Sequence, residues 1–495
     1  MTGKMACICL LAGTVLARLG VGAIEAQEAK ETPSRSRAVG LPQTPAQSAG
    51  SGPSSGQSAF GETSPTGGFV TIFFTGNELG AMQPCGCSGG QLGGLDRRHA
   101  VLSSVGPENR LIIDTGFLVP ESTEQNLIKF NVIVQAFSQL GYDLVNLTEQ
   151  DMLIARQAGL FDGLGSVFNI ITANCPDDAN LPAKFTRRFT LNASAVDVTV
   201  AVAGTDEQIF AVARMLPAED TNSSGTVNIV IVSRTDAVSV AAETRAFDCI
   251  ISPPQSDEPM LIGDANARPL VISVGRLGKY VGKIRVALTA ASQKPQLSFS
   301  AIPVAENLPQ HQPLVELYKD YQRLVKETNL LERYPKFVLP DNLEYVGSRS
   351  CKLCHDYEYE KWSTSQPLIL HSGDTPSQGR HANAFATLEK VGSDYDPECV
   401  ICHVVGMQYQ SGFISPAKTP ELKDIGCENC HGPGSEHLRS LGAVETSGPI
   451  STCTDCHTSE HSAEYAGNEK QYFEKIIHWR EPVSLVRVKE PNRAP

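Results

Sequence analysis

Four short segments of the chain carry the residues best suited to chemistry, and each follows the pattern Cys-x-x-Cys-His. They read "CKLCH", "CVICH", "CENCH" and "CTDCH", and they begin at Cys351, Cys399, Cys427 and Cys453. Two thiols spaced three residues apart reach the two vinyl groups of one haem, and the next residue places an imidazole beside the iron. A zinc ribbon, a redox dithiol or a disulfide framework needs no histidine after every second cysteine. The pattern therefore predicts four covalently bound haem c groups.

The motifs assign a role to each of their cysteines and histidines. The predicted thioether-forming residues are Cys351, Cys354, Cys399, Cys402, Cys427, Cys430, Cys453 and Cys456. The predicted proximal iron ligands are His355, His403, His431 and His457. Seven further histidines lie outside the motifs, namely His99, His311, His371, His381, His437, His461 and His478, and the predicted sixth ligands come from His381, His437, His461 and His478. A second imidazole favours electron transfer, whereas an open position permits chemistry at the iron.

The region that must position these groups, residues 344–482, is small for four porphyrins. We therefore expect the haems themselves to form much of its core, with their edges close together. Gly, Pro and Ser are scattered between the motifs, which predicts short helices and long loops.

The same region resembles the tetrahaem cytochrome c-552/c-554 family, which is known from electron transfer out of hydroxylamine oxidation. The resemblance rests on "YVGSRSCKLCH", Trp362, "HANAFATL", "ECVICHVVGMQ", "GCENCHGPGSEH", "CTDCHTSEHS" and "IIHW". It implies three haems with two histidine ligands each and one remaining haem whose iron has an open position.

The resemblance also implies which distal histidine serves which haem. His381 would serve the fourth haem, His437 the first, and His478 or alternatively His461 the third. The second haem, at Cys399 and Cys402, would then be the candidate for the open position. This chain carries extra residues between Trp362 and His381, and His371 among them is a competing candidate for the ligand from that loop.

Residues 68–305 predict an α/β or α+β layered domain in front of the haem motifs. Apolar runs typical of strands are "FVTIFF", "RLIID", "VNIVIVS", "FDCIIS" and "PLVISVG". The segment "NLIKFNVIVQAFSQLG" predicts an amphipathic helix capped by Gly141. We interpret "GGLDRRHA" as a turn followed by a helix start, since a lone glycine pair is a weak nucleotide-binding signal.

This front domain resembles the calcineurin-like metallophosphoesterases of the periplasmic 5′-nucleotidase branch. The resemblance rests on "TGNELG", "GGLDRRHAVL", "LIIDTGF", "QLGYDLVNLTEQD", "ITANC", "IVIVSR" and "RPLVISVGRLGKYVGKIRVAL". The positions of the family's metal ligands carry other residues here, namely Asn77, Leu79, Phe117, Thr148, Glu149, Gln150, Arg234, Ser252, Pro253, Pro254 and Gln255. A two-metal hydrolase needs anionic and imidazole ligands, so we expect hydrolysis to be lost.

Cys85 and Cys87 follow the first of these replaced ligand positions. They form either a redox dithiol or soft-metal site, or a strained disulfide or pair of inert thiols in a structural turn. Cys175 and Cys249 are open to burial or to a long-range disulfide.

The remaining segments predict how the chain is organised. Residues 1–26 resemble a secretory signal peptide, and residues 27–67 have too few large apolar groups to order themselves. Residues 306–343 predict a connector with an amphipathic helix that ends before Pro335, and residues 483–495 form a tail. No later apolar stretch approaches the roughly 20 residues that span a bilayer. A formal charge of −13 argues against a nucleic-acid partner.

The sequence favours an exported, periplasmic electron carrier with four haem c groups, redox protein partners and an inactive phosphoesterase-like domain as scaffold or docking module. The alternative is an oxidoreductase that acts at an open haem or at Cys85 and Cys87. A redox-regulated hydrolase is the third hypothesis.

Overall fold

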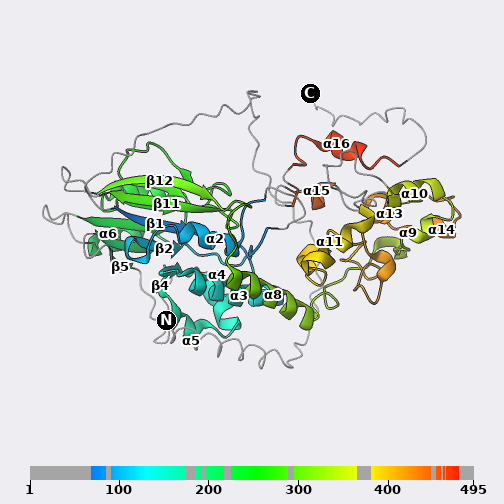
Figure 1. Ribbon diagram of the computed structural model, residues 1–495, viewed down its shortest axis with the longest axis horizontal. Coiled ribbons are helices and arrows are strands. Elements are labelled where there is room, and N and C mark those ends of the chain that lie inside the picture. The colour runs from blue at the N-terminus through cyan, green and yellow to red at the C-terminus, as the bar shows by residue number, and fades with distance from the viewer. Residues whose placement is uncertain are drawn as a thin grey trace.

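The computed structural model describes residues 69–84, 91–173, 186–191, 196–216, 225–287, 295–364, 381–446, 453–458, 461–462 and 464–478. The predicted signal peptide, leader and tail lie outside these ranges, as do Cys85, Cys87, Cys175 and His371. The described residues form a front domain of sheets and helices, a connector helix and a region of short helices (Figure 1).

The first sheet of the front domain has six strands. Their spatial order is β12 (Gln296–Pro303), β11 (Tyr280–Ala287), β1 (Phe69–Thr75), β2 (Arg110–Asp114), β3 (Leu144–Asn146) and β4 (Asn169–Ile171). β1 to β4 run parallel to one another, and β1 also pairs antiparallel with β11. The predicted strands "FVTIFF" and "RLIID" are confirmed as β1 and β2, whose aromatic and β-branched residues suit a buried parallel sheet.

The second sheet also has six strands. Their order is β5 (Thr186–Leu191), β6 (Val196–Ala203), β7 (Thr226–Val232), β8 (Cys249–Ser252), β10 (Leu270–Ser273) and β9 (Met260–Leu261). β6, β7, β8 and β10 are parallel, whereas β5 and β9 pair antiparallel at the edges. The three later strands predicted from apolar runs are confirmed as β7, β8 and β10.

The two sheets pack face to face, and helices cover both outer faces. Val70, Ile72 and Phe74 of β1 point between the sheets, whereas Phe73 points outward, as the two-residue period of a strand requires. The first sheet is covered by α2 (Leu95–Leu102), α3 (Glu124–Leu140), α4 (Glu149–Gln157) and α5 (Phe161–Val167), with a 3-10 turn, η1 (Pro107–Asn109), before β2. The second is covered by α6 (Asp206–Met215) and α7 (Ala237–Glu243). These four layers confirm the predicted layered α/β domain (Figure 1).

Helix α3 is capped at both ends, and its C-cap is the predicted Gly141. Thr123 accepts a hydrogen bond from the backbone of Asn126, and Gly141 ends the helix at a φ of 78°, where a side chain is disfavoured. The helix is buried around more of its circumference than an amphipathic stripe predicts, since Lys129 and Asn131 are also buried. The reason is that the connector helix α8 (Gln312–Glu327) packs across it.

The predicted connector helix is confirmed as α8, and it ends before Pro335. Its buried residues Leu314, Leu317, Tyr321 and Val325 recur at helical spacing, which places one apolar face against the front domain. Within the described part of the chain, no helix is both long and apolar enough to cross a membrane.

The region after α8 consists of short helices joined by loops, as predicted. The helices are α9 (Ser348–Cys351), α10 (Asp356–Thr364), α11 (Ala384–Val391), α12 (Pro397–Val400), α13 (Cys427–His431), α14 (Ser435–Arg439), α15 (Cys453–Cys456) and α16 (Glu469–Glu474). Three 3-10 turns accompany them, namely η2 (Pro340–Asn342), η3 (His381–Asn383) and η4 (Pro420–Leu422). One apolar cluster, centred on Phe385, Phe413 and Val400, lies beside the second Cys-x-x-Cys-His motif.

Candidate haem sites and the Asn77–Leu79 loop

Each Cys-x-x-Cys-His motif lies on one helical turn at or next to a short helix. In the first and fourth motifs the histidine N–H bonds to the carbonyl of the first cysteine, as His355 to Cys351 at 2.9 Å and His457 to Cys453 at 2.8 Å. Residues three and four apart share a helix face. The turn therefore places both thiols and the imidazole on one side, which is the arrangement that thioether attachment and proximal ligation require.

Three of the motif histidines face a second histidine from elsewhere in the chain. The ring centroids are 6.1 Å apart for His355 and His437, 6.4 Å for His381 and His457, and 6.0 Å for His431 and His478. Metal–imidazole bonds are about 2 Å long, so two rings that ligate one metal from opposite sides have centroids about 6 Å apart. The spacing of all three pairs fits an iron held between them.

In His437, His478 and His403 the ring nitrogen Nδ1 lies within hydrogen-bonding distance of a backbone carbonyl. Nδ1 of His437 lies 2.7 Å from the carbonyl of Val444, Nδ1 of His478 lies 2.8 Å from that of Ile476, and Nδ1 of His403 lies 2.6 Å from that of Ala384. A carbonyl only accepts, so Nδ1 must carry the proton and donate it. Nε2 then keeps its lone pair, and the tautomer is the one that a metal ligand needs.

Burial around these histidines favours the neutral ring. Desolvation, followed by the charges of His457 and His403, lowers the pKa of His381 to about 4. Burial also lowers the pKa of His403, His431 and His457. A neutral imidazole is the form that binds a metal.

Thiols of different motifs lie next to one another. The side chains of Cys351 and Cys427 are within hydrogen-bonding reach, and so are those of Cys402 and Cys456. Burial and then the neighbouring thiols, beginning with Cys453, raise the pKa of Cys430. The first attachment site is thus adjacent to the third, the third to the fourth, and the fourth to the second.

Much of this region has apolar groups that protein atoms leave uncovered. Among the described residues, α10, α15 and α16 contain no buried side chain. Leu353 is 82% exposed and Phe473 is 53% exposed, and Cys354 is also on the surface. A porphyrin joined to each motif would cover such surfaces, so the residues present fit the predicted group.

The other described histidines lie in different surroundings. Nδ1 of His461 lies 2.8 Å from the hydroxyl of Thr458. After burial, the charge of His461 also lowers the pKa of His403. His99 and His311 stack on each other in the front domain, with ring centroids 3.9 Å apart. Sequence reasoning missed this stacking, because the two residues lie far apart in the chain.

The structure brings together three residues at the expected ligand positions of the front domain, Asn77, Leu79 and Phe117. The N–H of Asn77 bonds to the carbonyl of Gly116 at 2.7 Å, and that of Leu79 to the carbonyl of Phe117 at 3.1 Å. Asn77, Leu79 and Phe117 all have left-handed φ angles, of 53°, 50° and 62°. Such strain is typical of functional loops, yet the side chains of Leu79 and Phe117 have no atom that binds a metal.

A buried polar network lies next to this loop, and sequence reasoning missed it. Arg98 and Glu78 are both fully buried and form two hydrogen bonds, of 2.6 and 2.8 Å. Arg98 also donates to the hydroxyl of Tyr142 at 3.1 Å. Thr75 links that hydroxyl to Asp114 through two contacts of 2.7 Å. Burial, followed by the charge of Glu78, raises the pKa of Asp114 to about 8.

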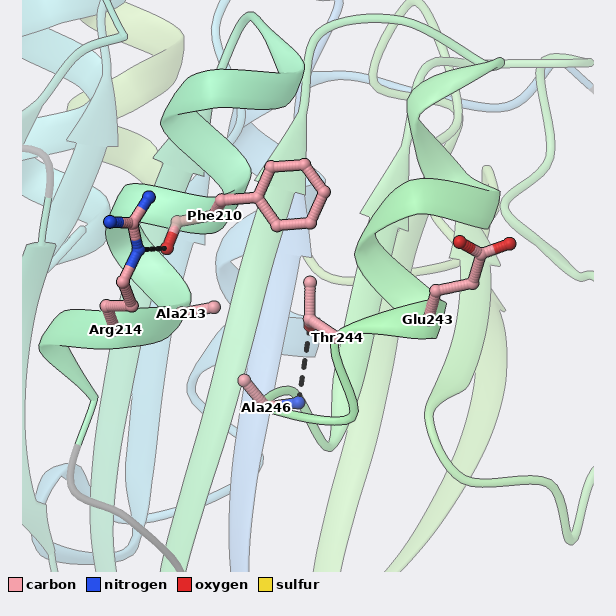
Figure 2. A pocket seen from close by; sticks show the side chains of 6 residues that line it. All are labelled: Phe210, Ala213, Arg214, Glu243, Thr244 and Ala246. Atoms are coloured by element: carbon pink, nitrogen blue, oxygen red, sulfur yellow. Dashed lines mark hydrogen bonds between the residues drawn. The ribbon is translucent and has the colours of Figure 1, made fainter.

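Two further features of the front domain lie apart from both sites. Cys249, in β8, is a buried free thiol, and burial together with Asp248 raises its pKa well above the usual range. A shallow hollow of about 530 Å³ opens between α6 and α7, and Figure 2 shows the ring of Phe210 turned into it. It is lined by Phe210, Ala213, Arg214, Glu243, Thr244 and Ala246. None of these is a predicted site residue.

Comparison with known proteins assigns the class of the C-terminal region. The family model described as "Cytochrome c554 and c-prime" matches residues 350–432, which include the first three attachment motifs. These residues therefore define a c-type cytochrome region, which implies covalently bound haem c.

A relative of this region is cytochrome c-554. Over 150 residues the chain is 27% identical to cytochrome c-554 of Nitrosomonas europaea, with 26% of this chain and 63% of that protein covered. The match thus spans less than two thirds of the relative's length. The C-terminal region resembles this cytochrome, as its motifs predict.

The front domain resembles 5′-nucleotidases and calcineurin-like phosphoesterases in its fold. A 5′-nucleotidase precursor from Thermus thermophilus superposes with a TM-score of 0.42 and 14% identity, covering 57% of this chain and 63% of that chain. The calcineurin-like phosphoesterase YfkN from Bacillus subtilis gives a TM-score of 0.40 and 15% identity, covering 52% of this chain and 98% of that chain.

Proposed function

We propose that the protein is an exported tetrahaem c-type cytochrome that carries electrons between redox partner proteins. The observation that carries the proposal is the set of three imidazole pairs with ring centroids 6.0 to 6.4 Å apart. Bound haem supplies a reversible one-electron change at its iron, and two imidazole ligands suit that iron to electron transfer rather than to substrate binding.

The pairs support a ligand assignment for three haems. His355 and His437 hold the first, and His431 and His478 hold the third. His457 and His381 hold the fourth. The carbonyl contacts at Nδ1 orient His437 and His478 and direct Nε2 toward the metal. His403 is the proximal ligand of the second haem and is oriented by the carbonyl of Ala384.

The cysteine contacts support an order of haems that differs from their order in sequence. Cys351 neighbours Cys427, Cys430 neighbours Cys453, and Cys456 neighbours Cys402. Electrons would therefore pass in the order first, third, fourth, second. The first and second haems then lie at the two ends of the path, where partner proteins or the front domain can reach them.

The front domain acts in this proposal as a scaffold or docking module and not as a hydrolase. Leu79 and Phe117 occupy ligand positions and offer no oxygen, nitrogen or sulfur to a metal, whereas two-metal hydrolysis needs such ligands to activate water. Export is supported by the predicted signal peptide and by covalent haem attachment, which generally takes place outside the cytoplasm.

Spectroscopy on paired histidine variants tests the ligand assignment. We expect His478→Ala to convert one low-spin haem to high-spin in the electron paramagnetic resonance spectrum, because the third iron loses an imidazole. His461→Ala is the matched control, and it should keep the wild-type count of low-spin haems. If His461→Ala instead produces the high-spin haem and His478→Ala does not, His461 is the distal ligand of the third haem. High-spin iron in the wild type that binds carbon monoxide and reduces a substrate would favour the oxidoreductase alternative.

A further inference from the structure

The second attachment helix, α12, is held in place by side chains from outside the cytochrome region. Its N-cap residue Asp396 is 6% exposed and accepts the backbone N–H of Glu398 at 3.0 Å. The same carboxylate accepts hydrogen bonds of 2.8 Å from the amide of Gln125 and from the hydroxyl of Tyr321. Gln125 lies on α3 and Tyr321 on α8. The start of the helix that carries Cys399 is therefore fixed by the front domain and the connector.

The ammonium of Lys129 is a buried cation at the contact between α3 and α12. Its side chain is 7% exposed, and its ammonium pairs with the carboxylate of Glu398, the residue directly before Cys399. A Cβ built on Gly80 would lie 3.1 Å from Cδ of Lys129 and 3.4 Å from Nζ. The Asn77–Leu79 loop lies on the other side of the ammonium. The ammonium is thus enclosed, whereas the carboxylate of Glu398 beside the second attachment site is 54% exposed.

We propose that Lys129 is a positioning residue of the second haem, through which the front domain sets that haem's reduction potential. The inference rests on the proposed function, since it needs a haem at Cys399 and Cys402. Removing the ammonium leaves the carboxylate of Glu398 uncompensated beside this haem. Oxidised iron carries one more positive charge than reduced iron, so an added negative charge stabilises the oxidised form and lowers the potential.

A spectroelectrochemical titration of the full-length protein tests this role. In Lys129→Met we expect one of the four redox components to move to lower potential, so that less than half of that haem is reduced at its wild-type midpoint. The other three components should stay in place. Lys129→Arg should keep the wild-type value, and Lys129→Met combined with Glu398→Gln should return toward it. Glu398→Gln alone should move the same component to higher potential.

Arg333→Gln is the matched control for loss of a boundary ion pair. Arg333 binds Glu124 of α3 through bonds of 2.8 and 2.7 Å, and its partner is not on α12. This variant should leave all four components unchanged. Unchanged titrations in both Lys129→Met and Glu398→Gln, or an equal shift of every component, would overturn the inference. Peptide mass spectrometry that finds no haem on Cys399 and Cys402 would instead overturn the proposed function.

Discussion

Replacing Arg98 by Met tests whether a buried ion pair stabilises the loop that contains Asn77, Glu78 and Leu79. Arg98 and Glu78 have no exposed side-chain surface, and two hydrogen bonds of 2.6 and 2.8 Å join them. A Cβ on Gly278 would come within 1.9 Å of the guanidinium, so backbone closes the site on that side. Removing one partner of a buried pair leaves an uncompensated charge, at a cost of about 3–5 kcal/mol. We expect a loss of this size in the free energy of unfolding.

Amide hydrogen exchange in β1 and β2 measures this loss for the front domain separately from the haem region. Replacing both partners, as Arg98→Met with Glu78→Met, should recover most of the stability, because apolar pairs substitute well for buried ion pairs. Arg234→Met is the control: its pair with Asp206 is 3.0 Å long and about half exposed, so water screens it and its loss should change stability little. If Arg98→Met lowers the free energy of unfolding no more than this control does, the buried pair of Arg98 and Glu78 does not stabilise the loop.

Two further predictions concern the same part of the front domain. Because burial and Glu78 raise the pKa of Asp114 from 3.8 to about 8, the folded protein binds this proton more tightly than the unfolded chain. The contribution of Asp114 to stability should be complete below pH 3.8 and should fall toward pH 8 by up to about 1.4 kcal/mol per pH unit, and Asp114→Asn should remove that contribution from the slope in exchange measurements. A wild-type slope in the variant would contradict this. The purified protein supplied with manganese or zinc should release no phosphate from nucleotides, whereas metal-dependent release would show that the replaced ligands do not matter.

The fold could be predicted where its information is local in sequence. Apolar runs marked the strands β1, β2, β7, β8 and β10, and Gly141 marked the end of α3. The burial of Lys129 and Asn131 could not be predicted, because it arises when α8 and the cytochrome region close over α3. Helical periodicity describes one face of a helix and carries no information on how many neighbours it will meet.

The same distinction between local patterns and tertiary contacts applies to the candidate sites. The attachment cysteines and proximal histidines are predicted from spacing alone, whereas the support for His478 over His461 comes from the fold, which places the ring of His478 6.0 Å from that of His431. Arg98 and Glu78 lie 20 residues apart, and Lys129 and Glu398 lie 269 apart. No pattern in the chain joins such residues, so both pairs became visible only in three dimensions.

Spin integration of the electron paramagnetic resonance spectrum of the fully oxidised protein tests the central claim most directly, because it reports both the number of haems and their coordination. We expect four haem irons per chain, with low-spin, six-coordinate iron at the first, third and fourth sites. Fewer than four haems, or high-spin iron at any of those three sites, would contradict it.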